Sequence, residues 1–232
     1  GAVQDYKRGL IVGSTSTYGK GTVQRNISFG RPLDSLGIQT EYGSVKLTFQ
    51  KFYRITGSST QLRGVASDIV LPDEFEFFKY REKDNESALP WDEMQKAKYQ
   101  VWNSQINLPS IAAAANKKIT GDTSFTKLKK NFQWIASQSE KTINLQIDSF
   151  VSYKKKVIEV GKQNEAILRL KDSMHIQPLK ADYDKFYNNP DKSKQDRYQA
   201  WLKQVSKDRQ ISECIKLVDQ FVSPAMIDKK IT

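Results

Sequence analysis

A single lysine enclosed by glycines is the residue of this chain best suited to chemistry. It lies in the run Ser16-Thr17-Tyr18-Gly19-Lys20-Gly21-Thr22-Val23-Gln24, at the entrance to an expected strand. The glycines let other backbone approach closely, and Tyr18 adds an aromatic ring that can exclude water. Because desolvation disfavours the ammonium form, an enclosed amine can become a base near neutral pH. Such a base can take the proton from a serine hydroxyl, as in a Ser-Lys hydrolase.

Gln24 is the second candidate for this site. If the strand already runs from Lys20, alternation places Lys20, Thr22 and Gln24 on one face of the strand. The glutamine amide can then orient the amine without adding a charge. The pattern alone does not establish catalysis, because a lysine in a Gly-x-Gly turn is usually a solvated surface residue.

The scarcity of cysteine and histidine excludes several other chemistries. The 232 residues contain one cysteine, Cys214, and one histidine, His175, so no internal disulfide can form and a dedicated zinc site is not expected. The same counts argue against a Ser-His-Asp or Cys-His centre. We expect Cys214 to be a small buried apolar residue of a helix and His175 to lie on the surface or at a helix end. We expect no metal and no cofactor.

The net charge of +11 is spread along the chain rather than gathered in one patch. Residues 1–72 carry nine Lys and Arg against four Asp and Glu, and residues 73–232 carry 28 against 22. A solvated basic surface is the simplest interpretation, and Lys154-Lys155-Lys156 is expected to be a solvated helix face. A nucleic-acid-binding module remains an alternative, which predicts salt-sensitive binding to oligonucleotides.

Glycine divides the chain into two regions with different patterns. Ten of the twelve glycines lie at or before Gly64, whereas all four tryptophans follow residue 90. The first region predicts strands at 9–13, 22–29 and 44–55, a turn-rich connection at 30–41, and a hairpin turn at 56–59. The second predicts helices at 110–118, 125–139 and 206–222, with 142–150 ambiguous between strand and helix. The fold class expected is therefore α+β.

Within 44–55 the sequence alternates, which predicts Val45, Leu47 and Phe49 on one face and Lys46, Thr48 and Gln50 on the other. An apolar stripe is expected in each of the two later helices: Phe125, Leu128, Phe132 and Ile135 in 125–139, and Ile211, Cys214, Ile215, Val218, Phe221 and Val222 in 206–222. Trp91 is expected to be a packing residue.

Ordered blocks of residues resemble a known family of proteases. Tyr18-Gly19-Lys20-Gly21-Thr22-Val23-Gln24 is similar to the lysine motif of the C-terminal processing, or tail-specific, serine proteases. The similarity continues upstream in Gln4-Asp5-Tyr6, and downstream in Gln50–Arg54, Gly57–Gln61 and Ala88–Asp92. It is dense over residues 2–92 and diffuse over 93–232. It is greatest to the long periplasmic form of the family, which has a helical C-terminal extension.

The resemblance implies roles for both candidate residues. Lys20 matches the general base that activates a serine nucleophile, and Gln24 matches the glutamine that positions this lysine. The family's serine lies upstream of the Gln-Asp-Tyr block, so we expect this chain to be a C-terminal piece that is inactive alone. Ser16 and Ser14, four and six residues before Lys20, are alternatives, but Ser-x-x-Lys enzymes need the lysine three residues after the serine. We expect both to be loop hydroxyls that bond to backbone.

The resemblance also implies an organisation, a location and partners. Residues 1–72 would be the C-terminal, β-rich portion of the protease core, 73–92 a linker or anchor, and 93–232 a mainly helical domain. The parent enzyme would cleave periplasmic or cell-envelope proteins that it recognises by their apolar C-terminal tails, with a lipoprotein adaptor as a further partner. A helical protein-interaction module remains the alternative function. No run approaches the roughly 18 apolar residues of a membrane span, and residues 1–6 show no signal peptide.

Overall fold

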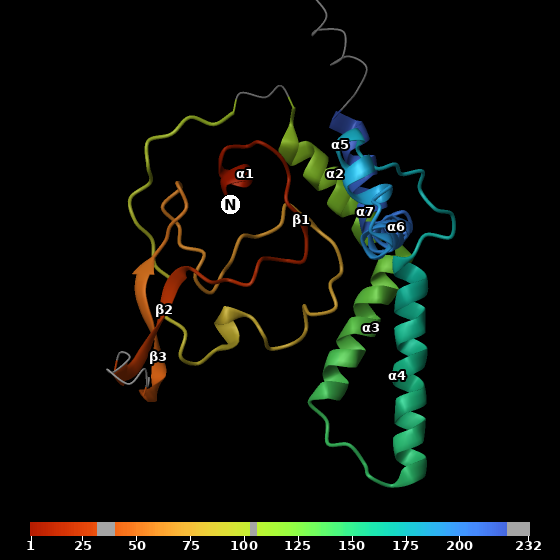
Figure 1. The fold of residues 1–232 in the computed structure, drawn as a ribbon, viewed down its shortest axis with the longest axis horizontal. Helices are drawn as coiled ribbons and strands as arrows, with labels where there is room; N and C mark the ends of the chain where they lie inside the picture. Colours follow the sequence, from red (N-terminus) through yellow and green to blue (C-terminus); the bar gives the residue numbers. More distant parts are fainter. Residues whose placement is uncertain (32–39, 103–105, 222–232) are drawn as a thin grey trace, which may run out of the picture. The chain divides into compact units, whose positions relative to one another are not determined.

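The α+β fold predicted from the sequence is the fold of this chain. A computed structural model describes residues 1–31, 40–102 and 106–221, so most of the turn-rich connection expected at 30–41 lies outside the described residues. The chain forms two compact units: Gly1–Val70 with Phe78–Leu108, and Leu71–Phe77 with Pro109–Thr232. The described strands lie in the first unit, and most of the described helices lie in the second (Figure 1).

A small parallel pairing organises the start of the first unit. Helix α1 (Ala2–Asp5) precedes β1 (Val12–Gly13), and β1 pairs in parallel with β4 (Ile69–Val70). Ile69 is fully buried there. The Asp68 carboxylate supports the pairing, because it accepts hydrogen bonds from the Ile11 amide at 2.8 Å and from Gln4 Nε2 at 2.9 Å. The strand expected at 9–13 is thus confirmed only at its end.

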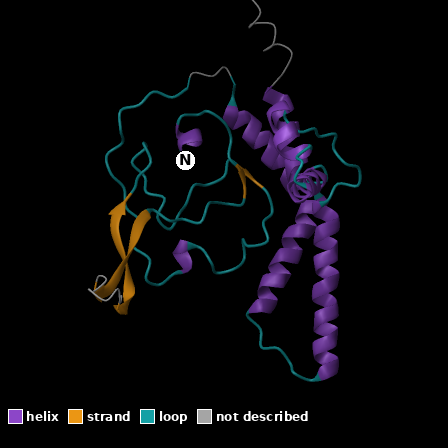
Figure 2. Ribbon diagram, in the orientation of Figure 1, coloured by secondary structure: helices purple, strands orange, loops and turns teal. Residues whose placement is uncertain are grey.

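A two-stranded antiparallel ribbon follows the lysine loop. It consists of β2 (Thr22–Arg31) and β3 (Thr40–Lys51), which lie together at one edge of the first unit in Figure 2. The alternation expected in β3 places apolar side chains on one face, together with those of β2. That face is open to solvent, since its apolar side chains are between 40% and 57% exposed; they are Ile27, Phe29, Val45, Leu47 and Phe49.

The segment after residue 77 packs back on the first unit. It contains one 3-10 turn, η1 (Glu82–Asp84). Trp91 was expected to be a packing residue, and its indole N–H donates to the carbonyl of Ser59 at 2.9 Å while the Arg63 guanidinium stacks 3.5 Å from its ring centre. These contacts tie residues 88–92 to the turn that ends at Gln61.

The second unit begins with three helices: α2 (Leu108–Gly121), α3 (Thr123–Ser139) and α4 (Ile147–Leu168). Asp122 caps α3 by accepting from the amides of Ser124 and Phe125. The apolar stripe expected in α3 forms the core, since Phe125, Leu128 and Phe132 are at most 4% exposed. Helices α3 and α4 lie side by side (Figure 1), joined by an Asn131–Asn164 hydrogen bond of 2.7 Å. Of the ambiguous stretch 142–150, residues 142–146 form a loop and residues 147–150 form the first turn of α4.

The rest of the second unit contains α5 (Lys180–Asp182), the π-helical turn η2 (Tyr183–Tyr187), α6 (Lys192–Val205) and α7 (Arg209–Phe221). The stripe predicted for α7 comprised Ile211, Cys214, Ile215, Val218, Phe221 and Val222. The prediction is wrong for Ile215 and Val218, which are 44% and 54% exposed, whereas Leu217 is buried.

The α7 helix is turned so that its inner face includes the Glu213 carboxylate. This group is 15% exposed and pairs with Lys216 at 2.6 Å and with Lys118 of α2 at 3.6 Å. The side chains of Phe221 and Val222 lie outside the described part of the chain.

Candidate active site

The structure brings the two predicted site residues together. Lys20 lies in the loop before β2, two residues before the strand begins, and is half-buried. Its Nζ donates a hydrogen bond of 2.7 Å to Oε1 of Gln24, the third residue of β2. The Gln24 amide therefore orients the amine without placing a further charge beside it.

The backbone around Lys20 is held by the segment 60–62, forty residues further along the chain. Thr60 Oγ1 donates to the Lys20 carbonyl at 2.8 Å, and Gln61 Oε1 accepts from the Gly21 amide at 2.8 Å. The single peptide group between Lys20 and Gly21 is therefore held at its oxygen and at its nitrogen. The Leu62 amide also donates to the Gly19 carbonyl at 2.7 Å.

This close contact explains both glycines that enclose the lysine. Gly19 has φ +99°, which disfavours any residue with a Cβ. A Cβ at Gly21 would lie 2.6 Å from the Gln61 amide nitrogen, closer than atoms can approach. The Gly-Lys-Gly pattern is thus needed to lay the loop against residues 60–62.

Gln61 is the buried centre of this arrangement. It is fully buried, and its Nε2 donates to Glu82 Oε1 at 3.0 Å and to the Leu89 carbonyl at 3.1 Å. Gln61 follows the hairpin turn expected at 56–59, and no local pattern in the sequence indicates a role for it. Its presence in the Gly57–Gln61 block of the resemblance was the signal that could have singled it out.

The loop serines make local hydrogen bonds. Ser14 Oγ donates to the Ser16 carbonyl at 3.1 Å, and Ser16 Oγ donates to the Thr17 carbonyl at 3.1 Å. Ser16 Oγ also accepts from Arg81 Nη1 at 2.9 Å. These partners are those of hydroxyls that satisfy backbone and neighbouring side chains.

The other residues named with Lys20 take different places. Tyr18 is 46% exposed, and its ring lies 6.4 Å from that of Tyr80, so it does not bury the loop as expected. Thr22 is 5% exposed at the start of β2. The strand begins at Thr22 rather than at Lys20, so the meeting of Lys20 with Gln24 comes from the loop as much as from strand alternation.

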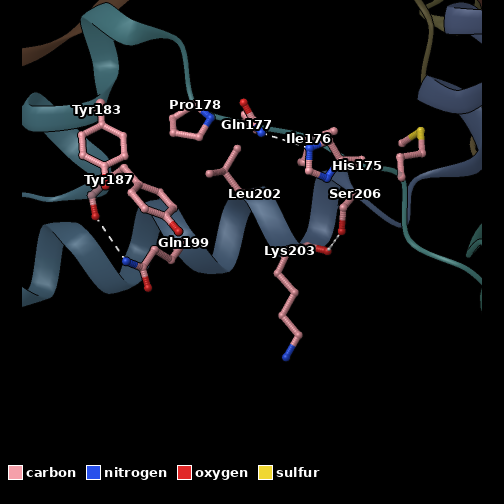
Figure 3. Close-up of a pocket in the computed structure, with 11 residues that line it drawn as sticks. His175, Ile176, Gln177, Pro178, Tyr183, Tyr187, Gln199, Leu202, Lys203 and Ser206 are labelled. Atoms are coloured by element: carbon pink, nitrogen blue, oxygen red, sulfur yellow. Dashed lines mark hydrogen bonds between the residues drawn. The ribbon is translucent and has the colours of Figure 1, made fainter.

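His175 lines a pocket of about 530 Å³ in the second unit. Figure 3 shows Tyr183, Tyr187, Pro178 and Leu202 among the residues that line this pocket, with the Lys203 side chain directed away from the pocket. The His175 ring nitrogen Nε2 lies 3.0 Å from Gln177 Nε2. Cys214 is half-buried in α7, and burial raises the pKa of its thiol, as suits an unreactive packing residue.

An ionic cluster ties the base of β3 to the segment after η1. Lys51 Nζ and the Tyr53 hydroxyl both donate to Asp92 Oδ2, at 2.8 Å and 3.0 Å. The hydrogen bond from Lys51 holds the pKa of Asp92 below its usual value of 3.8, and the same bond raises the pKa of Lys51 above 10.5. Burial, followed by the bond to Asp92, raises the pKa of Tyr53.

Asp92→Asn is expected to lower the thermal stability of the protein slightly at neutral pH. A lowered carboxyl pKa stabilises the fold at pH values above the unfolded value of 3.8, and this contribution is lost as the pH falls through the lower folded value. Thermal unfolding followed by tryptophan fluorescence should therefore show a lower melting temperature for Asp92→Asn than for the wild type at pH 7. This difference in melting temperature should narrow below pH 3.8. Asp172→Asn, at an exposed position, serves as the control. An equal difference in melting temperature at both pH values would contradict a stabilising role of the ionised Asp92 carboxylate.

Two further properties hold for the residues that the structure describes. They contain no group of three or more His, Cys, Asp and Glu side chains arranged to hold a metal ion. None of their helices combines the length and the apolar character needed to cross a membrane.

Two family models match consecutive parts of this chain. The model described as peptidase family S41 matches residues 1–71, which contain Lys20 and Gln24. The model described as the C-terminal domain of tail specific protease matches residues 75–223. The first match gives the class of the lysine region, a peptidase, and the second specifies the type.

Curated relatives carry the same names. A tail-specific protease of Haemophilus influenzae is 37% identical over 175 residues, which cover 74% of this chain and 24% of the relative. A carboxy-terminal-processing protease of Bartonella bacilliformis is 38% identical over 71 residues, 31% of this chain and 14% of the relative. The chain belongs to the tail-specific protease family of S41 serine peptidases. It spans about a quarter of the length of the Haemophilus relative.

Proposed function

We propose that this chain supplies the general base of a tail-specific serine endopeptidase, with Lys20 as the base and Gln24 as the residue that orients it. The observation that carries the proposal is the 2.7 Å hydrogen bond between Lys20 Nζ and Gln24 Oε1, inside the part of the chain that matches the peptidase family. In its neutral form the amine removes the proton from a serine hydroxyl as the hydroxyl attacks the peptide carbonyl. The protonated amine then returns this proton to the leaving nitrogen.

The serine of this dyad is proposed to lie outside the 232 residues. The hydroxyls of Ser14 and Ser16 already bond to loop backbone, and neither occupies the position of a Ser-x-x-Lys nucleophile. The chain by itself is therefore proposed to be inactive.

The same proposal assigns parts of the chain to different tasks. Residues 1–72 belong to the proteolytic core, 73–92 form an anchor, and 93–232 form the helical domain, whose first helix begins at Leu108. The contacts of Leu89 and Asp92 with Gln61 and Lys51 support the anchor. The helical domain helps to hold substrates or a lipoprotein adaptor. The enzyme acts in the periplasm or cell envelope on proteins with apolar C-terminal tails. The relatives' names support the action at protein C-termini.

The test compares two forms of the protein on matched substrates. One form is the protein at its natural length, with whatever residues flank this sequence, and the other is the 232-residue chain. The substrates are one reporter protein that ends in an apolar tail or in an acidic tail. We expect the natural-length protein to cleave the apolar-tailed reporter at least about tenfold faster, as a tail-binding enzyme should by differential binding, and we expect no cleavage by the 232-residue chain.

Either of two results would contradict the proposal. Equal cleavage of both reporters would remove the tail preference, and cleavage by the 232-residue chain that depends on Lys20 would place the nucleophile within it.

A further inference from the structure

We infer that Thr48 is a positioning residue of the proteolytic site, which acts on Lys20 through the amide of Gln24. Thr48 lies in β3, opposite Gln24 of β2. Gln24 Nε2 donates to Thr48 Oγ1 at 3.1 Å, while Gln24 Oε1 accepts from Lys20 Nζ at 2.7 Å. The inference rests on the proposed function of Lys20 as a general base.

An irregularity in the strand pairing places Thr48 at this position. Thr22 pairs with Lys51 and Val23 with Gln50, so regular pairing would put Phe49 opposite Gln24. The register instead shifts by one residue between Val23 and Gln24, which brings Thr48 opposite Gln24. A β-bulge of this kind redirects a side chain, and such bulges are enriched beside active sites.

The burial pattern of β3 agrees with a facing role for Thr48. Leu47 and Phe49, its neighbours on the strand, are 48% and 57% exposed, whereas Thr48 is half-buried. Its side chain shares the face of the ribbon that carries Gln24, because directly paired residues point to the same face. The bulge thus substitutes a hydroxyl for a phenyl ring beside the candidate catalytic amide.

The chemical consequence concerns the lone pair of the amine. A primary amide presents an oxygen that accepts and an NH₂ group that donates, and either can face a neutral amine. If the NH₂ group faced Lys20, it would donate to the lone pair that must receive the serine proton. Thr48 gives that NH₂ group an acceptor of its own. The amide oxygen then accepts an N–H from Lys20, and the lone pair stays free.

The test is Thr48→Val in the protein at its natural length, with Thr48→Ser as the conservative variant. Valine keeps the shape and favours the strand but offers no acceptor to the amide. We expect kcat on an apolar-tailed peptide to fall about tenfold with KM within about twofold, as misplacement of a catalytic group predicts. Serine should restore most of kcat. Ser44→Ala removes a hydroxyl from the exposed part of the same strand, four residues away, and should leave kcat unchanged.

A double-variant comparison shows whether Thr48 acts through Gln24. In a Gln24→Leu background, Thr48→Val should cause no additional loss of kcat, because the amide that it positions is gone. A wild-type kcat for Thr48→Val, or a full additional loss in the Gln24→Leu background, would overturn the inference. Lys20→Met separates this failure from failure of the proposed function: an active Lys20→Met protein refutes both, whereas an inactive one with normal Thr48→Val refutes only the role of Thr48.

Discussion

Replacing Lys20 with methionine is expected to lower kcat/KM of the natural-length protein about 10⁴-fold, as removal of one member of a serine-hydrolase triad does. Methionine has a similar length but carries no amine, so the serine proton has no acceptor. Lys20→Arg should be as inactive, because a guanidinium keeps its proton at all relevant pH values. Steady-state cleavage of an apolar-tailed peptide measures both effects.

A matched lysine variant separates chemistry from loss of charge. Lys83→Met removes one exposed lysine in η1 of the same unit and should leave activity unchanged. A Lys20→Met protein that retains more than about a tenth of wild-type activity would be inconsistent with general-base catalysis, which typically contributes 10²–10⁴-fold.

Gln61→Leu is expected to give the largest change in stability. Leucine fits the volume but leaves the Gly21 amide, the Glu82 carboxylate and the Leu89 carbonyl without their partner. An unpaired buried polar group costs about 1–3 kcal/mol, so local unfolding around Lys20 should become easier by about 2–4 kcal/mol. Hydrogen exchange at the Gly21 amide in the natural-length protein reports this directly and should accelerate at least about 30-fold.

Gln133→Leu provides the control for this prediction. Gln133 is exposed in the middle of α3, and glutamine and leucine have similar helix propensities. Its replacement should change stability by less than about 0.5 kcal/mol. If the Gly21 amide exchanged at the same rate in Gln61→Leu as in the wild type, the hydrogen bond from this amide to Gln61 would not be what holds the loop.

Local sequence patterns predicted the meeting of Lys20 with Gln24 and the core of α3. Both depend on residues a few positions apart, where strand alternation and helix periodicity restrict the geometry, although the loop before Thr22 also contributes to the meeting of Lys20 with Gln24. The hydrogen bonds of Thr60 and Gln61 to the Lys20–Gly21 peptide group join residues forty positions apart, so no periodic pattern in the sequence predicts them. The parallel pairing of Val12 with Ile69 was hidden for the same reason.

Two further features depend on packing rather than on pattern. The bulge at Phe49 brings Thr48, rather than Phe49, opposite Gln24. The sequence does not reveal it, because the apolar alternation of Val45, Leu47 and Phe49 is the one that regular pairing would also show. In α7, the inward Glu213 carboxylate and Leu217 set the buried face, because partners in the fold stabilise a charged residue there. A count of apolar residues alone could not identify that face.

Trapping of the acyl-enzyme tests the central claim, that Lys20 activates a serine beyond these residues. The natural-length protein is mixed with an activated peptide ester that ends in an apolar tail, the reaction is stopped in acid during the first turnover, and the acylated residue is mapped by mass spectrometry. We predict an acyl group on one serine outside residues 1–232 in the wild type, and none in Lys20→Met. An acyl group on Ser14 or Ser16, or one that forms equally fast in Lys20→Met, would contradict the account.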